Sequence, residues 1–213
     1  MIVAEIWRYP VKSMAGERLS AASVGELGIA GDRVVHVEDA RGRVVTARTH
    51  PRLLGHRGTT GPDGPLVDGR RWDSPEVRAD VAAIVGPGAR LVRDESEDRF
   101  DVLPLLVATD GAIRAFGYDG RRLRPNLVIG GVEGLAERTW EGGRLRIGEV
   151  VIGIEDLRGR CVMTTFDPDS LVQDPEVLRS IVRRFDGRLA LNCYVVHGGV
   201  IRAGDAAAID LQD

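Results

Sequence analysis

The chain has 213 residues, of which 43% are hydrophobic and 29% charged, a composition typical of a globular protein with one large domain or two small interlocked ones. Its formal net charge of −3 at pH 7 argues against nucleic acid as a partner. We expect a cytoplasmic protein with no membrane partner, because the first residues do not resemble a signal peptide and no segment reaches the roughly 18 apolar residues of a membrane span.

The N-terminal segment is expected to form a strand that ends at Tyr9-Pro10, because proline has no N–H to donate to a neighbouring strand. Lys12 and Ser13 follow at once and supply an ammonium and a hydroxyl. Both groups suit a phosphate or another oxyanion. A solvated lysine in a turn explains the same residues, so the pattern leaves both interpretations open.

A hairpin is predicted next, with strands over Val34–Val37 and Arg43–Ala47. Arg33 precedes the first strand and Arg48 follows the second, so two guanidiniums lie on the two sides of the hairpin. Together they could bind an anion. Arg33 could equally pair with its neighbour Asp32.

Two helices and a linker are predicted in the middle of the chain. Ser74-Pro75 begins one helix, which Gly86 ends. The charged stretch Asp94–Asp101 reads as a linker, and we place a domain boundary there, between residues 1–93 and residues 94–213. Thr109 or Asp110 begins a second, short helix at the end of a strand, a position where an anion can bind.

The densest basic run precedes a buried-looking strand and includes Arg124 and Asn126. Basic runs are usually solvated. Here the arginine offers a charge, and the asparagine amide can recognise the edge of a polar ring. Nucleic acid is the competing ligand, but no aromatic residues interleave the arginines.

The C-terminal part reads as strands with one more helix, capped by Asp174. Leu145–Val150 and Ile201–Ala206 share a strand–glycine–strand pattern, which suits a barrel of similar β-turn units. The fold class is therefore predicted to be mainly β, a barrel with a few flanking helices. No Ser-His-Asp elbow, Walker loop or G-x-G-x-x-G run occurs, which disfavours hydrolase and nucleotide-binding functions.

The two cysteines differ in their surroundings. Cys193 lies in an apolar strand and reads as a small buried core residue. Cys161 follows Arg160 and precedes two threonines, and a neighbouring guanidinium favours the thiolate, a soft metal ligand. Their spacing is not that of a zinc site. A disulfide between them is possible, but free thiols are expected in a reducing compartment.

Taken in order, these segments resemble the MOSC family, the proteins with a molybdenum cofactor sulfurase C-terminal domain. Within it, the likeness is to the amidoxime-reducing component type. The resemblance spans residues 9 to 205 and is carried by the following stretches: Tyr9-Pro10-Val11-Lys12-Ser13, Asp32-Arg33, Val45-Thr46-Ala47-Arg48, Arg124-Pro125-Asn126-Leu127-Val128-Ile129, Arg160-Cys161, Thr164-Thr165-Phe166-Asp167-Pro168-Asp169 and Ile201-Arg202-Ala203-Gly204-Asp205.

The resemblance implies a MOSC-type β-barrel in residues 94–213 and a β-rich, barrel-like N-terminal region in residues 1–93. It implies a molybdenum cofactor (molybdenum–molybdopterin), with Cys161 as the catalytic residue and the protein's metal ligand. The cofactor-binding residues that it implies are Lys12, Ser13, Arg33, Arg48, Thr109, Asp110, Arg124, Asn126, Arg160 and Cys161. Pyridoxal phosphate binding is a further term at family level only.

The function that follows is a molybdenum-dependent reductase of small N-hydroxylated compounds such as amidoximes. No cysteine run for an iron–sulfur cluster follows the last strand, so electrons are expected from a separate flavin or iron–sulfur reductase. The alternative is a molybdenum cofactor carrier, or a sulfur-transfer domain with a persulfide on Cys161.

Overall fold

The structure, a computed structural model that describes residues 1–211, is mainly β. This confirms the fold class. An eight-stranded sheet dominates and is antiparallel except where β11 and β12 run parallel. Its strands, in spatial order, are β17 (Ala207–Asp210), β13 (Arg144–Ile147), β14 (Val150–Gly159), β15 (Arg188–His197), β11 (Leu105–Thr109), β12 (Leu127–Gly130), β1 (Ile2–Arg8) and β2 (Glu17–Leu19).

Three smaller sheets of three strands each complete the β-structure. They are β10 (Arg90–Arg93), β5 (Val35–Glu38) and β6 (Val44–Val45); β16 (Gly199–Arg202), β3 (Ala21–Gly25) and β4 (Gly28–Ile29); and β7 (Gly58–Gly61), β8 (Gly64–Val67) and β9 (Arg70–Arg71). The predicted hairpin is confirmed, because β5 pairs with β6.

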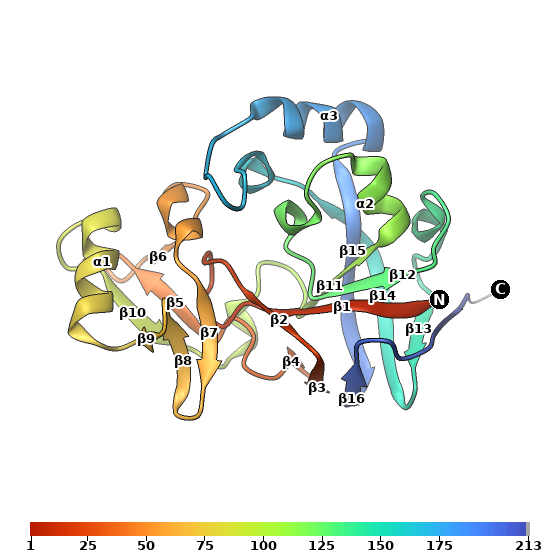
Figure 1. Cartoon of the computed structure of the whole chain (residues 1–213), viewed down its shortest axis with the longest axis horizontal. Coiled ribbons are helices and arrows are strands. Elements are labelled where there is room, and N and C mark those ends of the chain that lie inside the picture. The colour runs from red at the N-terminus through yellow and green to blue at the C-terminus, as the bar shows by residue number, and fades with distance from the viewer. Residues whose placement is uncertain (212–213) are drawn as a thin grey trace.

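All three predicted helices are present: α1 (Pro75–Val85), α2 (Asp110–Phe116) and α3 (Pro175–Phe185). Each begins where a side-chain oxygen of Ser74, Thr109 or Asp174 accepts a hydrogen bond from a backbone N–H of the first turn. Helices α2 and α3 lie on the same side of the large sheet, whereas α1 packs at the far end of the molecule with the small strands (Figure 1). No helix in the described residues is both long and apolar enough to cross a membrane.

Within the part of the chain that the structure describes, five short 3₁₀ helices fill the connections: η1 (Pro51–Gly55), η2 (Glu97–Arg99), η3 (Gly120–Leu123), η4 (Ala136–Thr139) and η5 (Val162–Thr165). Two of them, η3 and η5, lie beside the functional cavity described below.

The two halves of the chain are interlocked. Strands β1 and β2 belong to the large sheet, although every other strand of that sheet comes from residue 105 onwards. Conversely, β16 comes from the C-terminal half of the chain but pairs with β3, which comes from the N-terminal half. We call the part of residues 1–93 that lies outside the large sheet the N-terminal unit. One hydrophobic cluster lies against the large sheet, and a separate one lies within the N-terminal unit. The predicted boundary at residue 93 coincides with the end of β10, and the division into 1–93 and 94–213 stays a prediction.

Gly198 is where the chain leaves the large sheet after β15 and crosses to β3. A Cβ atom at this position would lie 2.5 Å from the carbonyl oxygen of Val24, which is too close for any side chain. The crossing therefore requires glycine, because only the bare backbone lets β3 approach this closely.

Substituting Gly198→Ala is expected to lower the free energy of unfolding by about 1–3 kcal/mol, the usual cost of overpacking. Gly25→Ala is the matched control, because a Cβ there meets nothing within 4 Å. Urea denaturation of both variants measures the difference. Equal stability of the two variants would contradict the packing argument.

Candidate functional site

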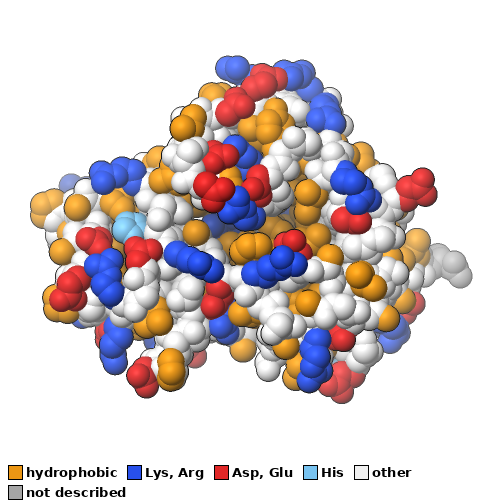
Figure 2. Space-filling view, viewed as in Figure 1, with side chains coloured by type: hydrophobic (Ala, Val, Ile, Leu, Met, Phe, Trp, Pro, Cys, Tyr) orange, Lys and Arg blue, Asp and Glu red, His pale blue; other side chains and the backbone are white. Residues whose placement is uncertain are grey.

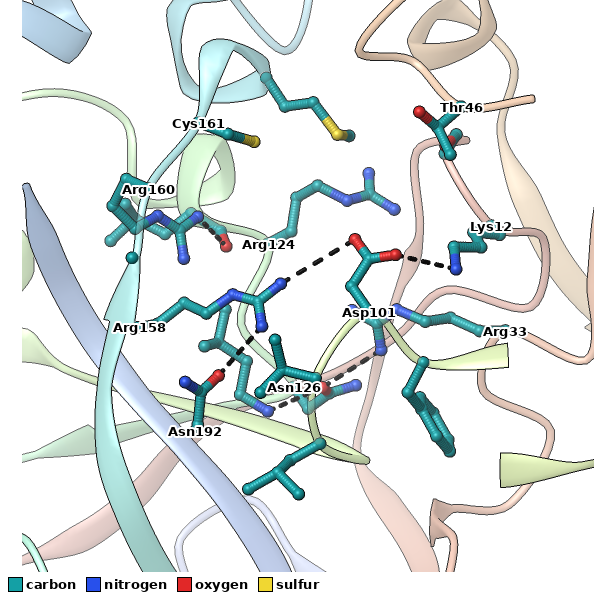
Figure 3. Close-up of a pocket in the computed structure, with 18 of the residues that line it drawn as sticks. Lys12, Arg33, Thr46, Asp101, Arg124, Asn126, Arg158, Arg160, Cys161 and Asn192 are labelled. Atoms are coloured by element: carbon teal, nitrogen blue, oxygen red, sulfur yellow. Dashed lines mark hydrogen bonds and ion pairs between the residues drawn. The ribbon is translucent and has the colours of Figure 1, made fainter. Parts of the chain in front are cut away.

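A cavity that opens to solvent lies between the N-terminal unit and the large sheet (Figure 3). Its volume is about 130 Å³, so a larger ligand would extend out of it. Cationic side chains dominate the lining, and Asp101 is the one carboxylate among the described residues that line it. The seven cations are Lys12, Arg33, Arg48, Arg122, Arg124, Arg158 and Arg160.

Backbone strain is concentrated in this lining. Ser13, Arg33 and Arg124 have φ angles of 70°, 55° and 56°, in the left-handed region that favours glycine. Such conformations persist only where surrounding contacts hold them, and they cluster at functional sites. Three of the seven non-glycine residues with positive φ among the described residues thus lie in one cavity.

The fully buried carboxylate of Asp32 holds the floor of the cavity together. It accepts hydrogen bonds from the backbone N–H of Tyr9 at 2.7 Å and from Nδ2 of Asn126 at 3.1 Å, and it pairs with Arg33. Oδ1 of Asn126 in turn accepts the N–H of Leu106 at 3.1 Å. The end of β1, the turn before β5 and the approach to β12 are therefore joined at one buried charge.

Asn126 thus lines the cavity as predicted, but its amide already has protein partners on both the oxygen and the nitrogen. In the structure, hydrogen bonds of this amide join Leu106 of β11 to Trp7 of β1 and to Asp32. Recognition of a ligand by this amide stays a prediction.

Asp101 organises the N-terminal side of the cavity. Its carboxylate lies 2.9 Å from Nζ of Lys12 (Figure 3) and 2.5 Å from a guanidinium nitrogen of Arg48. Burial alone would raise the pKa of Asp101, but the hydrogen bond and charge of Lys12, with Arg48 and Arg158, hold it below the usual range. Asp101 therefore stays ionised and fixes two cations toward the cavity.

Ser13 supports this arrangement from the backbone. Its buried hydroxyl oxygen accepts the N–H of Ala47 at 3.0 Å, which fixes the residue before Arg48. Lys12, the single lysine of the sequence, also donates to the carbonyl of Arg99 at 2.9 Å. Both predicted residues are thus held firmly at the rim of the cavity.

The opposite side carries charge that the described residues do not neutralise. Arg124 and Arg160 have no carboxylate within ion-pair distance among residues 1–211, and the buried Nε of Arg160 has no hydrogen-bond partner there. Burial lowers the pKa of each guanidinium to about 10. A bound anion would offset the cost of this desolvation, because a nearby negative charge favours the charged form of each guanidinium.

Cys161 lies at the end of this cationic array. It is a free, half-buried thiol, held where β14 ends and η5 begins, and its carbonyl accepts the hydroxyl of Thr164 at 2.9 Å. Arg48 from the N-terminal unit lies beside it; burial alone would lower the pKa of that guanidinium, but the charge of Asp101 and a hydrogen bond to Cys161 raise it. The site can therefore bind a multiply charged anion and present a soft sulfur to it.

Cys193 is confirmed as a core residue. It is fully buried in the main hydrophobic cluster, its thiol is free, and burial raises its pKa well above the usual range. No disulfide joins it to Cys161.

Two predicted site residues lie elsewhere. Thr109 is fully buried, caps α2 by accepting the N–H of Ala112, and donates its hydroxyl to Glu137 at 3.1 Å. Asp110 accepts the N–H groups of Gly131 and Val132. The start of α2 is thus already occupied by the chain's own groups, and the structure does not bring these two residues to the cavity.

Sequence reasoning also missed residues that the structure places there. Asp101 read as part of a charged linker, and no local pattern distinguished it from its acidic neighbours. Arg158 also lines the cavity, and its place three positions before Cys161 is the signal in the sequence, although it was not among the predicted cofactor-binding residues.

Comparisons with known proteins identify the family of the chain. The sequence model of the MOSC N-terminal beta barrel domain matches residues 1–82, and that of the MOSC domain matches residues 110–208. Among solved structures, the YUAD protein from Bacillus subtilis superposes over 100% of this chain and 96% of its own with a TM-score of 0.55. At 13% identity this likeness shows the fold alone.

Curated relatives are distant. Mitochondrial amidoxime reducing component 2 of Macaca fascicularis is 26% identical, over 81% of this chain and 68% of its own length. Mitochondrial amidoxime-reducing component 1 of Homo sapiens is 25% identical, over 79% and 67%. Molybdenum cofactor sulfurase 2 of Culex quinquefasciatus is 33% identical over 39% of this chain, which is 11% of that relative.

Substituting Asp32→Asn is expected to lower the free energy of unfolding by about 3–5 kcal/mol, because it leaves the Arg33 charge without its buried partner. The control is Asp73→Asn, which breaks the exposed pair with Arg71 and should change stability little, because water screens that pair. Chemical denaturation distinguishes the two. Equal, small losses would show that Asp32 does not hold the site together.

Glu137 gives a pH-dependent prediction. Burial raises its pKa, and its Oε1 has no hydrogen-bond partner among the described residues. A raised folded-state pKa contributes stability below the ordinary glutamate value of about 4.3, and this stability is lost as the pH rises through the folded-state pKa. Glu137→Gln should therefore gain stability relative to the wild type as the pH rises above the ordinary glutamate value of about 4.3, as followed by thermal unfolding. A difference that does not change with pH would refute the assignment.

Proposed function

The chain belongs to the MOSC domain family, and from that premise we propose that it is a molybdenum cofactor-binding reductase of small N-hydroxylated compounds. The observation that carries the proposal is the convergence of seven cationic side chains on one cavity that also holds a free, half-buried thiol. The names of the amidoxime-reducing relatives support the choice of substrate class.

The residues of the cavity fit the chemistry of such a cofactor. A pterin phosphate is a doubly charged anion, and arginine and lysine side chains bind phosphate oxygens well. Phosphate oxygens could accept hydrogen bonds from the buried Nε of Arg160, which has no partner among residues 1–211. They could also neutralise the buried guanidinium of Arg124. Cys161 would supply the thiolate ligand to the metal, since soft ligands suit such centres.

When bound, the cofactor supplies the two-electron chemistry that removes oxygen from an N–O bond. The chain's own residues bind and orient it. Arg124 and Arg160, which have no carboxylate partner among residues 1–211, would neutralise the anionic group, and Lys12, Arg33 and Arg48 would border it, two of them kept in place by Asp101. Arg158 and Arg160 line the same cavity as the thiol and place positive charge in it.

Pyridoxal phosphate forms its covalent link through a lysine. Lys12, the only candidate in the sequence, has its ammonium bonded to Asp101 and to the carbonyl of Arg99. We therefore do not include pyridoxal phosphate in the proposal. The separate electron donor and the cytoplasmic location stay predictions.

A second candidate is a sulfur or cofactor carrier, favoured by the sulfurase relatives and by the accessible thiol. The same cationic cavity would serve it. Mass spectrometry of the purified chain separates the two functions, because a persulfide adds one sulfur atom, about 32 Da, to Cys161 without molybdenum.

Protein purified from a host that makes the cofactor is expected to contain about one molybdenum atom per chain, and Cys161→Ala should abolish reduction of an N-hydroxylated base, because the thiolate is the protein's ligand. Metal analysis and an assay with a reconstituted electron donor measure both. Cys193→Ala is the control and should retain activity, since that sulfur lies in the core. Full activity of Cys161→Ala would sink the mechanism.

A further inference from the structure

A second cavity lies beside the first and belongs to no function described above. Its volume is about 320 Å³, within the range of small-molecule sites. Figure 2 shows a hollow near the middle of this face, with a hydrophobic floor and charged side chains around its rim. The lining residues used below are Trp7, Tyr9, Arg57, Arg124, Met163 and Phe166.

The two cavities share part of their lining. Arg122, Arg124 and Met163 line both. A ligand in the second cavity would therefore be separated by a single layer of side chains from the space that holds Cys161. This position suits a group that is bound next to the reacting centre without reacting itself.

Aromatic rings form much of the wall. Trp7 and Tyr9 come from the end of β1, and Phe166 comes from the end of η5. Tyr9 and Phe166 are buried, and the guanidinium of Arg124 lies 4.3 Å from the centroid of the Tyr9 ring. Flat surfaces of this kind stack favourably with planar rings.

The charge of the second cavity is positive. Asp169 is the one carboxylate in its described lining, and Arg121 neutralises it at 2.6 Å. Arg122 pairs with Asp167 at 2.9 Å. Arg57 and Arg124 remain, and neither has a carboxylate within ion-pair distance in residues 1–211.

We propose that the second cavity binds a flat aromatic ring that carries a negative charge, an aromatic carboxylate, with the ring between the aromatic side chains and the carboxylate at Arg57. In the reaction this ligand is the non-reacting part of the substrate, a role that rests on the proposed function. The binding itself does not depend on it.

The test is calorimetric titration of the full chain with 2-naphthoate and with uncharged 2-naphthalenemethanol. The wild type should bind naphthoate saturably and about tenfold more tightly than the alcohol, because a hydrogen-bonded charge pair is worth roughly that factor. Arg57→Ala should lose this preference. Arg52→Ala is the matched control, an exposed arginine of η1 that lines neither cavity, and it should bind like the wild type.

Quenching of Trp7 fluorescence locates the ligand. Naphthoate should quench the wild type, and Trp7→Phe should lose that component of the quenching while it retains saturable calorimetric binding. The proposal is overturned if the wild type shows no saturable binding at millimolar naphthoate, or if Arg57→Ala and Arg52→Ala bind it equally. Metal content and reductase activity play no part in this measurement, so its failure is distinguishable from failure of the proposed function.

Discussion

Positive charge held in a half-buried cavity is the constraint on which the rest of the structure depends. Seven cationic side chains converge there, and the chain's own carboxylates neutralise only some of them. Desolvated like charges repel one another, so this arrangement is costly unless an anion completes it. The left-handed backbone at Ser13, Arg33 and Arg124 is a second cost at the same place.

The interlocked topology is what holds these charges together. Lys12, Arg33 and Arg48 come from the N-terminal unit, whereas Arg158, Arg160 and Cys161 follow one another along and beyond β14. Buried Asp32 ties the end of β1 to Asn126. Because Asp32 lies in the turn before β5, a shift of that turn relative to the large sheet would break these hydrogen bonds.

The sequence predicted local elements well where side-chain chemistry decides them. Ser74, Thr109 and Asp174 each cap a helix as expected, and the β5–β6 hairpin forms where the turn residues predicted it. Such signals are local, so they can be found without knowledge of the fold.

The site was predicted only in part, because its assembly is tertiary. The order of motifs brought together Lys12, Ser13, Arg33, Arg48, Arg124, Asn126, Arg160 and Cys161, all of which line the cavity. Thr109 and Asp110 looked like an anion site, but Glu137 and the Gly131–Val132 backbone, distant in sequence, occupy their polar atoms. Asp101 gave no local signal, since its role comes from Lys12 and Arg48 across the fold.

The central claim is that Cys161 binds the metal of an anionic cofactor that the surrounding cations hold. X-ray absorption at the molybdenum edge tests it most directly, on cofactor-loaded wild type and Cys161→Ala. The account predicts that the variant loses one sulfur atom from the atoms bound to the metal, because the thiolate is the protein's ligand. Identical spectra from the two proteins would contradict it.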